Sequence, residues 1–165
     1  PVLGICIGVQ LLCQSSEEGD TACIGIFDNR VRKFDTLFAE AGILLPDATG
    51  TAASLSDADS CSARQADVPA DATILRPAGR LKIPHMGWNS VENLRSGLFT
   101  GIDQGAYVYY VHSFAPEVNA DTIATTTYGV PFSAAIRKDN FYGTQFHPEK
   151  SASIGAQILQ NFLTL

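Results

Sequence analysis

The first motif that could do chemistry is a cysteine between two glycines, Gly4-Ile5-Cys6-Ile7-Gly8. An apolar run precedes Cys6 and an apolar stretch of helical length follows it, so we expect a strand, a sharp turn and a helix. The glycines let the chain and a substrate approach the sulfur without Cβ clashes. At a helix N-terminus the dipole favours the thiolate, so we expect a lowered pKa for Cys6 and an oxyanion donor in the N–H of Ile7. The alternative is a buried cysteine in a glycine-rich turn.

The second motif is Phe146-His147-Pro148-Glu149, which follows a strand-like segment at 141–145. In an extended chain, residues two apart face the same side, so Glu149 can approach His147 while Pro148 stiffens the backbone. A carboxylate at that distance fixes the tautomer of the imidazole and stabilises its protonated form. Taken alone, the motif fits a surface histidine beside a glutamate better.

Together the two motifs supply a nucleophile, a base and a residue that orients the base. Cys6, His147 and Glu149 are therefore the candidate catalytic residues. The other two histidines, His85 and His112, have no acidic neighbour within a few residues and lie among aromatic and apolar residues, so we interpret them as core histidines. No close pair of cysteines or histidines has zinc-ligand spacing, and we expect neither a metal nor a cofactor.

Length and composition indicate one domain with a covered sheet. The chain has 165 residues, of which 45% are hydrophobic. Charged residues make up 17%, below the ~25% of an average globular protein. Many segments are therefore expected to be covered on both faces, as in a sheet between two helix layers.

The charge balance restricts the partners. The net charge is −6 and the 11 lysines and arginines are scattered, which argues against nucleic acid and anionic membranes. No apolar stretch approaches the ~20 residues that span a bilayer, and no signal peptide opens the chain, so we expect a cytoplasmic protein. The four cysteines, Cys6, Cys13, Cys23 and Cys61, are interpreted as free thiols.

The N-terminal half indicates the elements that must position Cys6. Apolar and turn residues predict a strand at 1–5, a helix at 7–16 and a hairpin at 24–34. Residues 36–45 fit one or two helical turns. An insertion at about 35–79 is largely Ala, Ser, Asp and Thr, shows no apolar periodicity, and is expected to be exposed and flexible.

The second half is predicted to be mostly strands. Short strands separated by Gly, Pro and Asn are expected at 87–91, 106–114, 122–127, 133–137 and 141–145. Ser151 is a cap candidate for a C-terminal helix that docks on the sheet. The apolar residues at helical spacing are Ile154, Ile158, Leu159, Phe162 and Leu163.

The chain resembles the triad-type (class I) glutamine amidotransferases. The resemblance rests on Gly4-Ile5-Cys6-Ile7-Gly8-Val9-Gln10 and on Gly143-Thr144-Gln145-Phe146-His147-Pro148-Glu149-Lys150-Ser151. Two further stretches, Pro84-His85-Met86-Gly87-Trp88-Asn89 and Tyr109-Tyr110-Val111-His112-Ser113-Phe114, are similar to the glutaminase subunits of imidazole glycerol phosphate synthases. The resemblance covers nearly the whole chain outside the insertion.

The resemblance implies an α/β fold, a flavodoxin-like three-layer sandwich with a central, mostly parallel sheet. Members of the family begin with two or three βα units, and a glycine-rich loop in those units supplies the second oxyanion N–H. Nothing in this sequence matches them, so we expect residues 1–165 to form one amidotransferase domain that is partial at the N-terminus. At ~30 residues per repeat, roughly 60 to 90 residues of the family pattern have no counterpart here.

The resemblance also implies a reaction. Cys6 attacks the side-chain amide of glutamine, His147 carries the proton to the departing ammonia, Glu149 orients His147, and water hydrolyses the thioester. The ammonia passes to a barrel-shaped cyclase, the other half of a heterodimer, which forms imidazole glycerol phosphate and aminoimidazole carboxamide ribotide in histidine biosynthesis.

Further site residues follow from the same similarity. The residues expected to line the glutamine pocket are Gln10, Glu18, His112, Ser113 and Phe114. The candidates for the face turned to the cyclase are Trp88, Asn89, Tyr109 and Lys150. Plain core aromatics and a solvated lysine are the alternatives for this second set.

Three other functions stay open from the sequence. The chain could be the glutaminase component of another amidotransferase, in anthranilate, guanylate or carbamoyl phosphate synthesis. It could be a free-standing cysteine hydrolase of γ-glutamyl amides, or a truncated, non-catalytic scaffold. A response of ammonia release to the ribonucleotide ligand of the cyclase distinguishes the glutaminase subunit from another amidotransferase, and good turnover of glutamine without a partner would indicate the free-standing hydrolase.

Overall fold

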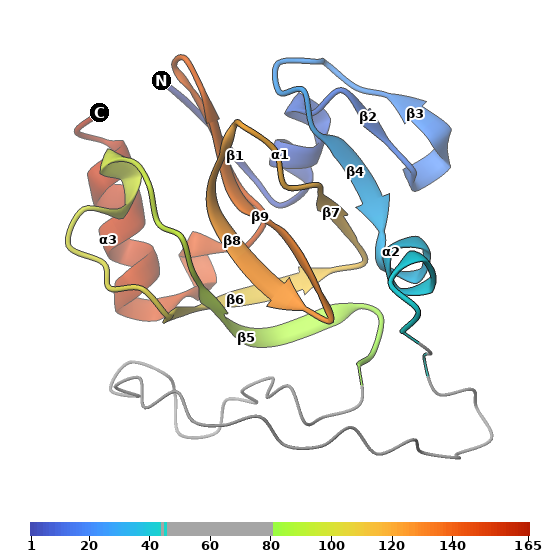
Figure 1. Ribbon diagram of the computed structural model, residues 1–165. Coiled ribbons are helices and arrows are strands. Elements are labelled where there is room, and N and C mark those ends of the chain that lie inside the picture. Colours follow the sequence, from blue (N-terminus) through green and yellow to red (C-terminus); the bar gives the residue numbers. More distant parts are fainter. Residues whose placement is uncertain (44, 46–80) are drawn as a thin grey trace.

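The computed structural model describes residues 1–43, 45 and 81–165. Its central sheet has the strand order β1-β10-β9-β8 (Figure 1). The strand bounds are β1 Val2–Ile5, β8 Thr122–Tyr128, β9 Val130–Lys138 and β10 Phe141–Thr144. Strand β1 pairs with β10 in parallel. Because parallel strands run in the same direction, Cys6 and the His147 motif leave the sheet at the same end.

Helices cover both faces of this sheet. Helix α1 (Ile7–Leu12) packs closely on one face, where a Cβ at Gly143 would lie 2.2 Å from Val9 Cγ2. Helix α3 (Ala152–Phe162) packs on the other, where the rings of Tyr142 and Phe162 meet edge to face. Successive strand residues point to opposite faces of the sheet. Gly143 and Tyr142, neighbours in β10, therefore face α1 and α3 respectively. The expected α/β class and its layers are confirmed.

The described part of the central sheet is mixed, with one parallel pairing and two antiparallel ones. Short turns connect β8 to β9 and β9 to β10, and a turn of that length can only join antiparallel strands. The parallel character expected from the resemblance is therefore limited here to the pair β1 and β10.

Two smaller sheets accompany the central one. Strands β5 (His85–Val91) and β6 (Ala106–His112) form an antiparallel pair. The other sheet has the order β3-β2-β4-β7, with the bounds β2 Ser15–Ser16, β3 Thr21–Ala22, β4 Arg30–Lys33 and β7 Phe114–Pro116. The remaining elements are α2 Phe34–Glu40 and the 3-10 turns η1 Glu18–Asp20, η2 Gly97–Phe99 and η3 Pro148–Lys150. Of the insertion predicted at about 35–79, residues 44 and 46–79 lie outside the described residues.

Two predictions for the N-terminal half are wrong. The helix ends at Leu12, because the backbone of Cys13 is extended and the following serines join a sheet. The hairpin at 24–34 does not form, since only β4 lies in that range and it pairs with β2 and β7. The buried amide of Asn29 donates to the carbonyl of Glu117 (2.6 Å), which directs the chain along β7 instead of back on itself.

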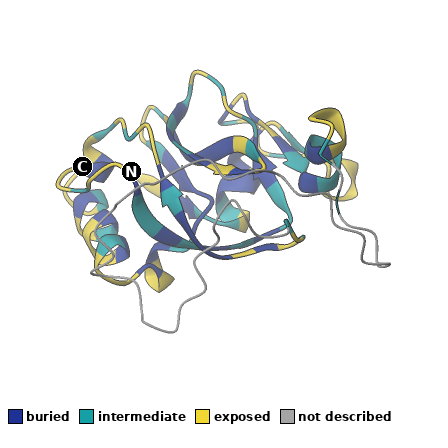
Figure 2. Ribbon diagram, turned by 60° about the horizontal axis from the view of Figure 1, so that its bottom comes forward, coloured by how far each residue is buried: buried dark blue, intermediate teal, exposed yellow. Residues whose placement is uncertain are grey.

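The core consists of two clusters on the two faces of the sheet. The smaller cluster lies under α1, and its buried members are Val9, Leu12, Cys13, Phe27, Val31 and Ile136. The larger one joins α2, α3 and the inner faces of β5, β6, β8 and β9. Figure 2 shows the buried residues along the strands and on the inward sides of the helices. None of the helices in the described ranges is long and apolar enough to cross a membrane.

The C-terminal helix forms as predicted, with two differences. Ile154, Ile158 and Phe162 contact the larger cluster, but Leu163 is 78% exposed and lies outside the stripe. Ser151 precedes the helix without capping it through its side chain, because that hydroxyl donates to the carbonyl of His147 (2.6 Å).

The close contact between α1 and β10 makes a stability prediction. We expect Gly143→Ala to lower the free energy of unfolding by roughly 1–3 kcal/mol, because the new methyl group overlaps Val9 and must displace the helix. Gly8→Ala is the control, since a Cβ there meets no atom within 4 Å. Urea unfolding of both variants measures the difference. Equal losses in the two variants would contradict this account of the contact.

Candidate active site

Cys6 occupies a strained elbow between β1 and α1. Its backbone has φ 50° and ψ −107°, a conformation that non-glycine residues seldom adopt. The N–H of Cys6 donates to the carbonyl of Thr144 (2.8 Å), which fixes the elbow to the end of β10. At Gly4 a Cβ would lie 2.7–2.8 Å from the backbone of the following helix, so the tight turn requires glycine there. Gly8 borders open space, as the approach of a substrate would need.

His147 and Glu149 form a hydrogen-bonded pair. His147 Nδ1 lies 2.6 Å from Glu149 Oε1, and the carboxylate can only accept, so the neutral ring carries its proton on Nδ1. Nε2 is then a lone-pair acceptor. It is buried and has no hydrogen-bond partner in the part of the chain that the structure describes. The pair forms across the 3-10 turn η3, and the extended geometry expected between the two residues is wrong.

Strand β6 brings the two motifs together. The carbonyl of Tyr109 accepts from the backbone N–H of His147 (2.9 Å), and the carbonyl of Val111 accepts from the thiol of Cys6 (3.9 Å). The hydroxyl of Ser151, fully buried, accepts from the N–H of Tyr109 (3.0 Å) and donates to the carbonyl of His147 (2.6 Å). Positions 109 and 111, two apart on one strand and therefore on the same side of it, thus contact the backbone of His147 and the sulfur of Cys6.

The thiol of Cys6 is expected to be neutral at rest. Burial raises its pKa, the N–H of Ile7 opposes this by a hydrogen bond, Glu149 raises it further and Lys150 lowers it, and the net pKa is raised. The prediction of a lowered pKa is therefore wrong, because burial outweighs the hydrogen bond from the N–H of Ile7. A thiol of this kind needs an adjacent base. His147 Nε2, buried and without a hydrogen-bond partner among the described residues, is available to accept a proton.

Comparison with known proteins gives the family. The protein-family model described as "Glutamine amidotransferase class-I" matches residues 1–165. The chain belongs to the class-I glutamine amidotransferase family. Over its full length it is 41% identical to proteins named "Imidazole glycerol phosphate synthase subunit HisH" from Bacteroides fragilis and Escherichia coli K12. It spans 64% of the length of each of these curated relatives.

One solved structure is similar over part of the chain. It is that of a putative GMP synthase subunit from Thermoplasma acidophilum, with 23% identity and a TM-score of 0.43. The similarity covers 51% of this chain and 45% of that one.

Two histidines of this amidotransferase chain lie in its core, as predicted. His85 is fully buried and His112 is 6% exposed, and His85 Nδ1 lies 2.8 Å from His112 Nε2. Burial lowers the pKa of His85 to about 2 and that of His112 to about 4. The resemblance places His112 at the glutamine pocket, and its ring packs among Phe34, Tyr110 and Phe132.

Three other residues expected at the glutamine pocket have defined contacts within the protein. Gln10 is 5% exposed, and its Nε2 donates to the carbonyl of Phe114 (3.1 Å) and to Gln145 Oε1 (2.9 Å). Both hydrogens of that amide are used, so a substrate contact by Gln10 would use Oε1 as an acceptor. Ser113 accepts the N–H of Phe34 through its carbonyl (3.1 Å). The ring of Phe114 is half-buried against the smaller core cluster.

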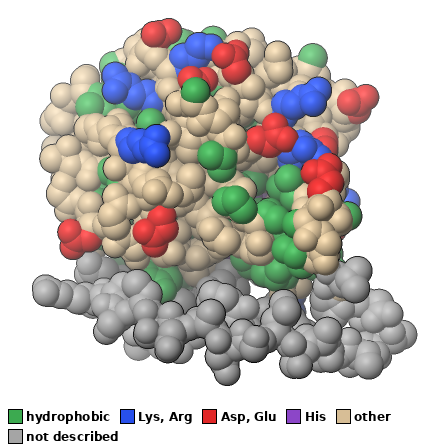
Figure 3. Space-filling view, viewed as in Figure 1, with side chains coloured by type: hydrophobic (Ala, Val, Ile, Leu, Met, Phe, Trp, Pro, Cys, Tyr) green, Lys and Arg blue, Asp and Glu red, His purple; other side chains and the backbone are tan. Residues whose placement is uncertain are grey.

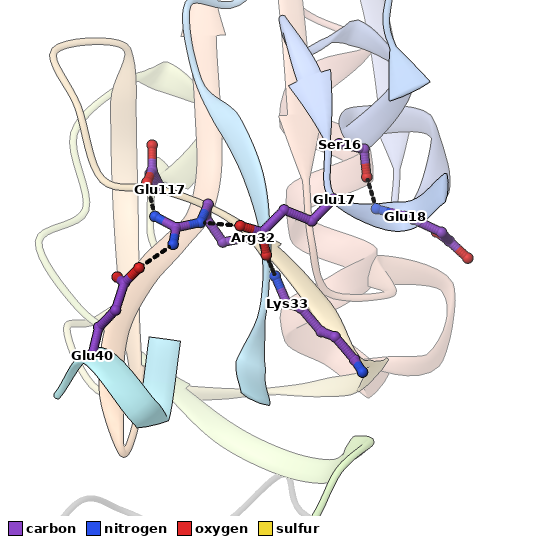
Figure 4. Close-up of polar contacts among 7 residues, drawn as sticks. All are labelled: Ser16, Glu17, Glu18, Arg32, Lys33, Glu40 and Glu117. Carbon is purple, nitrogen blue, oxygen red and sulfur yellow. Dashed lines mark hydrogen bonds and ion pairs between the residues drawn. The ribbon is translucent and has the colours of Figure 1, made fainter. Parts of the chain in front are cut away.

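Glu18 lies on an exposed hairpin that Arg32 holds in place. Arg32 bonds to Glu17 (2.5 Å), Glu40 (2.6 Å) and Glu117 (2.8 Å), as Figure 4 shows. Although burial raises the pKa of Glu17, its bonds from the N–H of Lys33 and from Arg32 hold that pKa below its usual value. The guanidinium therefore joins the base of the hairpin to α2 and to Glu117, the residue that follows β7.

Two of the four candidates for a partner face are buried, one is half-buried and one is exposed. Trp88 is 7% exposed and packs edge to face on Tyr109, with ring centroids 6.0 Å apart. Lys150 Nζ lies 6.0 Å from the centre of the Tyr109 ring. The side chain of Asn89 is 8% exposed and donates to the carbonyl of Thr127 (3.1 Å), away from these rings. The core-aromatic alternative therefore fits Trp88 better than Tyr109, which is half-buried, and Lys150 is exposed.

Surface charge gives no basic patch on the face in Figure 3. Lysines and arginines are scattered over that face, and acidic side chains are distributed over it as well. Cys13 is buried, and burial raises its pKa to about 12. Cys13 and Cys23 are free thiols as predicted, and Cys61 lies outside the described residues.

Sequence reasoning gave Gln145 no role and interpreted Ser151 only as a helix cap, but they contact Cys6 and His147 respectively. The signal was present for Gln145. A polar residue directly after an apolar strand, on the same face as Gly143, must find its partners on α1.

The buried histidines make stability depend on pH. Their pKa values in the folded state lie below the 6.5 of an unfolded histidine, so the unfolded chain binds more protons and stability is lost as pH falls below about 6.5. We expect a loss of about 1.4 kcal/mol per pH unit for each histidine between pH 6 and pH 5. Urea unfolding of wild type and His85→Gln at both pH values measures the slope. An unchanged slope in the variant would exclude a buried neutral His85.

Proposed function

We propose that this chain is the glutaminase part of an imidazole glycerol phosphate synthase. The observation that carries the proposal is the convergence of Cys6, with its raised pKa, and the His147–Glu149 pair on β6. The choice of this synthase comes from the names of the relatives that are 41% identical over the full chain. A synthase of this kind is expected in the cytoplasm.

The proposed reaction begins with proton transfer from Cys6 Sγ to His147 Nε2. The sulfur attacks the side-chain amide carbon of glutamine, and the N–H of Ile7, already directed at the sulfur, donates to the developing oxyanion. His147 then gives its proton to the departing nitrogen, which leaves as ammonia. Water, deprotonated by the same imidazole, attacks the thioester, and glutamate leaves as the thiol of Cys6 is restored.

Glu149 has an indirect part in this scheme. Its carboxylate keeps the proton of the neutral ring on Nδ1, and it stabilises the imidazolium formed when Nε2 takes the proton. Half of its side chain faces solvent, which weakens the second contribution.

Because His147 carries the proton and Glu149 acts only through His147, we expect the loss of His147 to lower activity more than the loss of the Glu149 carboxylate. We expect His147→Ala to lower kcat for glutamate release by about 10²–10⁴-fold, because it removes the proton carrier. Glu149→Gln should lose less, since the imidazole remains. Glu92→Gln, an exposed glutamate elsewhere, is the control for the change of charge. If His147→Ala retained activity within a few-fold of wild type, the base would be another group.

The partner makes a separate prediction. We expect glutamate release to rise when a barrel-shaped cyclase and its ribonucleotide ligand are added together, because the ammonia is proposed to serve that enzyme. The measurement is steady-state glutamate formation with the cyclase alone, with its ligand alone and with both. Stimulation only by the acceptor enzymes of anthranilate, guanylate or carbamoyl phosphate synthesis would assign the chain to another amidotransferase. High turnover without any partner would indicate a free-standing hydrolase.

A further inference from the structure

A buried glutamine lies against the nucleophile. Gln145 follows β10 directly and is fully buried, and its Nε2 lies 3.7 Å from Cys6 Sγ. Its Oε1 accepts from Gln10 Nε2 (2.9 Å). An amide has two hydrogens on one end and none on the other, so the role of Gln145 depends on which end faces the sulfur.

The carbonyl of Phe114 decides the orientation of Gln145. A carbonyl oxygen can only accept, so the Gln10 atom that lies 3.1 Å from it must be the nitrogen. The same nitrogen contacts Gln145, and the atom it contacts must be the oxygen. The N–H group of Gln145 is therefore the end that faces Cys6.

The same carbonyl fixes the protons of a second buried series. His112 Nδ1 must donate to it (2.8 Å), which leaves His112 Nε2 to accept from His85 Nδ1 (2.8 Å). His85 Nε2 then accepts from the amide of Asn89 (3.3 Å). Both histidines have lowered pKa values because of burial, so this arrangement persists at neutral pH.

We propose that Gln145 is a catalytic residue that stabilises the thiolate of Cys6 by hydrogen bonding, held in the donating orientation by Gln10 and the Phe114 carbonyl. A distance of 3.7 Å suits a neutral thiol, and the bond strengthens when the sulfur becomes charged. The donor offsets part of the cost of burying a thiolate, which is the cost that raises the pKa of Cys6. The proposal rests on the proposed function in taking Cys6 as the nucleophile.

The test measures the pKa of Cys6 without relying on glutamine. The second-order rate of iodoacetamide alkylation at Cys6 is followed by peptide mass spectrometry from pH 6 to pH 10 in wild type, Gln145→Met and Gln145→Glu. Gln145→Met keeps the bulk and removes the donor. Gln145→Glu keeps the acceptor that Gln10 uses and places a carboxylate beside the sulfur. Asn161→Leu removes a buried amide from α3, bonded to Leu98 and Thr100, and controls for general destabilisation.

We expect Gln145→Met to raise the pKa of Cys6 by about one unit, which lowers alkylation at neutral pH about tenfold, and Gln145→Glu to raise it further. Asn161→Leu should leave the profile unchanged. If Gln145→Met does not fold by circular dichroism, Gln145→Glu decides alone. A profile equal to wild type in the folded variants overturns the proposal.

Glutamate release by the same proteins separates this proposal from the proposed function. A wild-type chain that hydrolyses glutamine, together with unshifted alkylation profiles, rejects the role of Gln145 only. Shifted profiles in a protein that never hydrolyses glutamine, even with the cyclase, support the hydrogen bond and reject the proposed function. Glu149 and Lys150, whose charges also act on Cys6, are unchanged in every variant.

Discussion

The carbonyl oxygen of Phe114 can only accept hydrogen bonds, and this constraint orients the buried polar side chains around the candidate site. This oxygen accepts from both Gln10 and His112, and it cannot reverse either bond. Every hydrogen position from Asn89 in β5 to the sulfur of Cys6 follows from that constraint. Four segments distant in sequence, at 6–10, 85–89, 112–114 and 145, are thereby joined through buried polar side chains that have hydrogen-bond partners. Satisfied networks of this kind specify one structure.

The parts of the site that the sequence predicts depend on neighbours along the chain. The glycines around Cys6 indicate the elbow, because a tight strand-to-helix turn has local steric requirements that only small residues meet. His147 and Glu149 are two residues apart, so their contact needs no knowledge of the fold. The apolar stripe of α3 is likewise a local pattern, and it is wrong only at Leu163, where the helix has ended.

The parts that were missed depend on contacts between distant segments. The direction of the pKa shift of Cys6 follows from burial by other elements, and burial is not visible in a five-residue motif. The segment at 24–34 has the polar centre of a hairpin, but Asn29 finds its partner 88 residues away. Ser151 is a typical helix cap by type, and its hydroxyl binds β6 and His147 because tertiary contacts outweigh the local preference.

Arg32 has a consequence for how far the hairpin that carries Glu18 can be changed. The guanidinium and the short pairings of β2 attach the base of the Glu18 hairpin to β4, α2 and β7. Beyond this attachment the residues at the tip, 18–22, are exposed and contribute nothing to either core cluster. We therefore expect changes of length and charge in this tip to cost the fold little stability as long as Glu17 and Arg32 are kept.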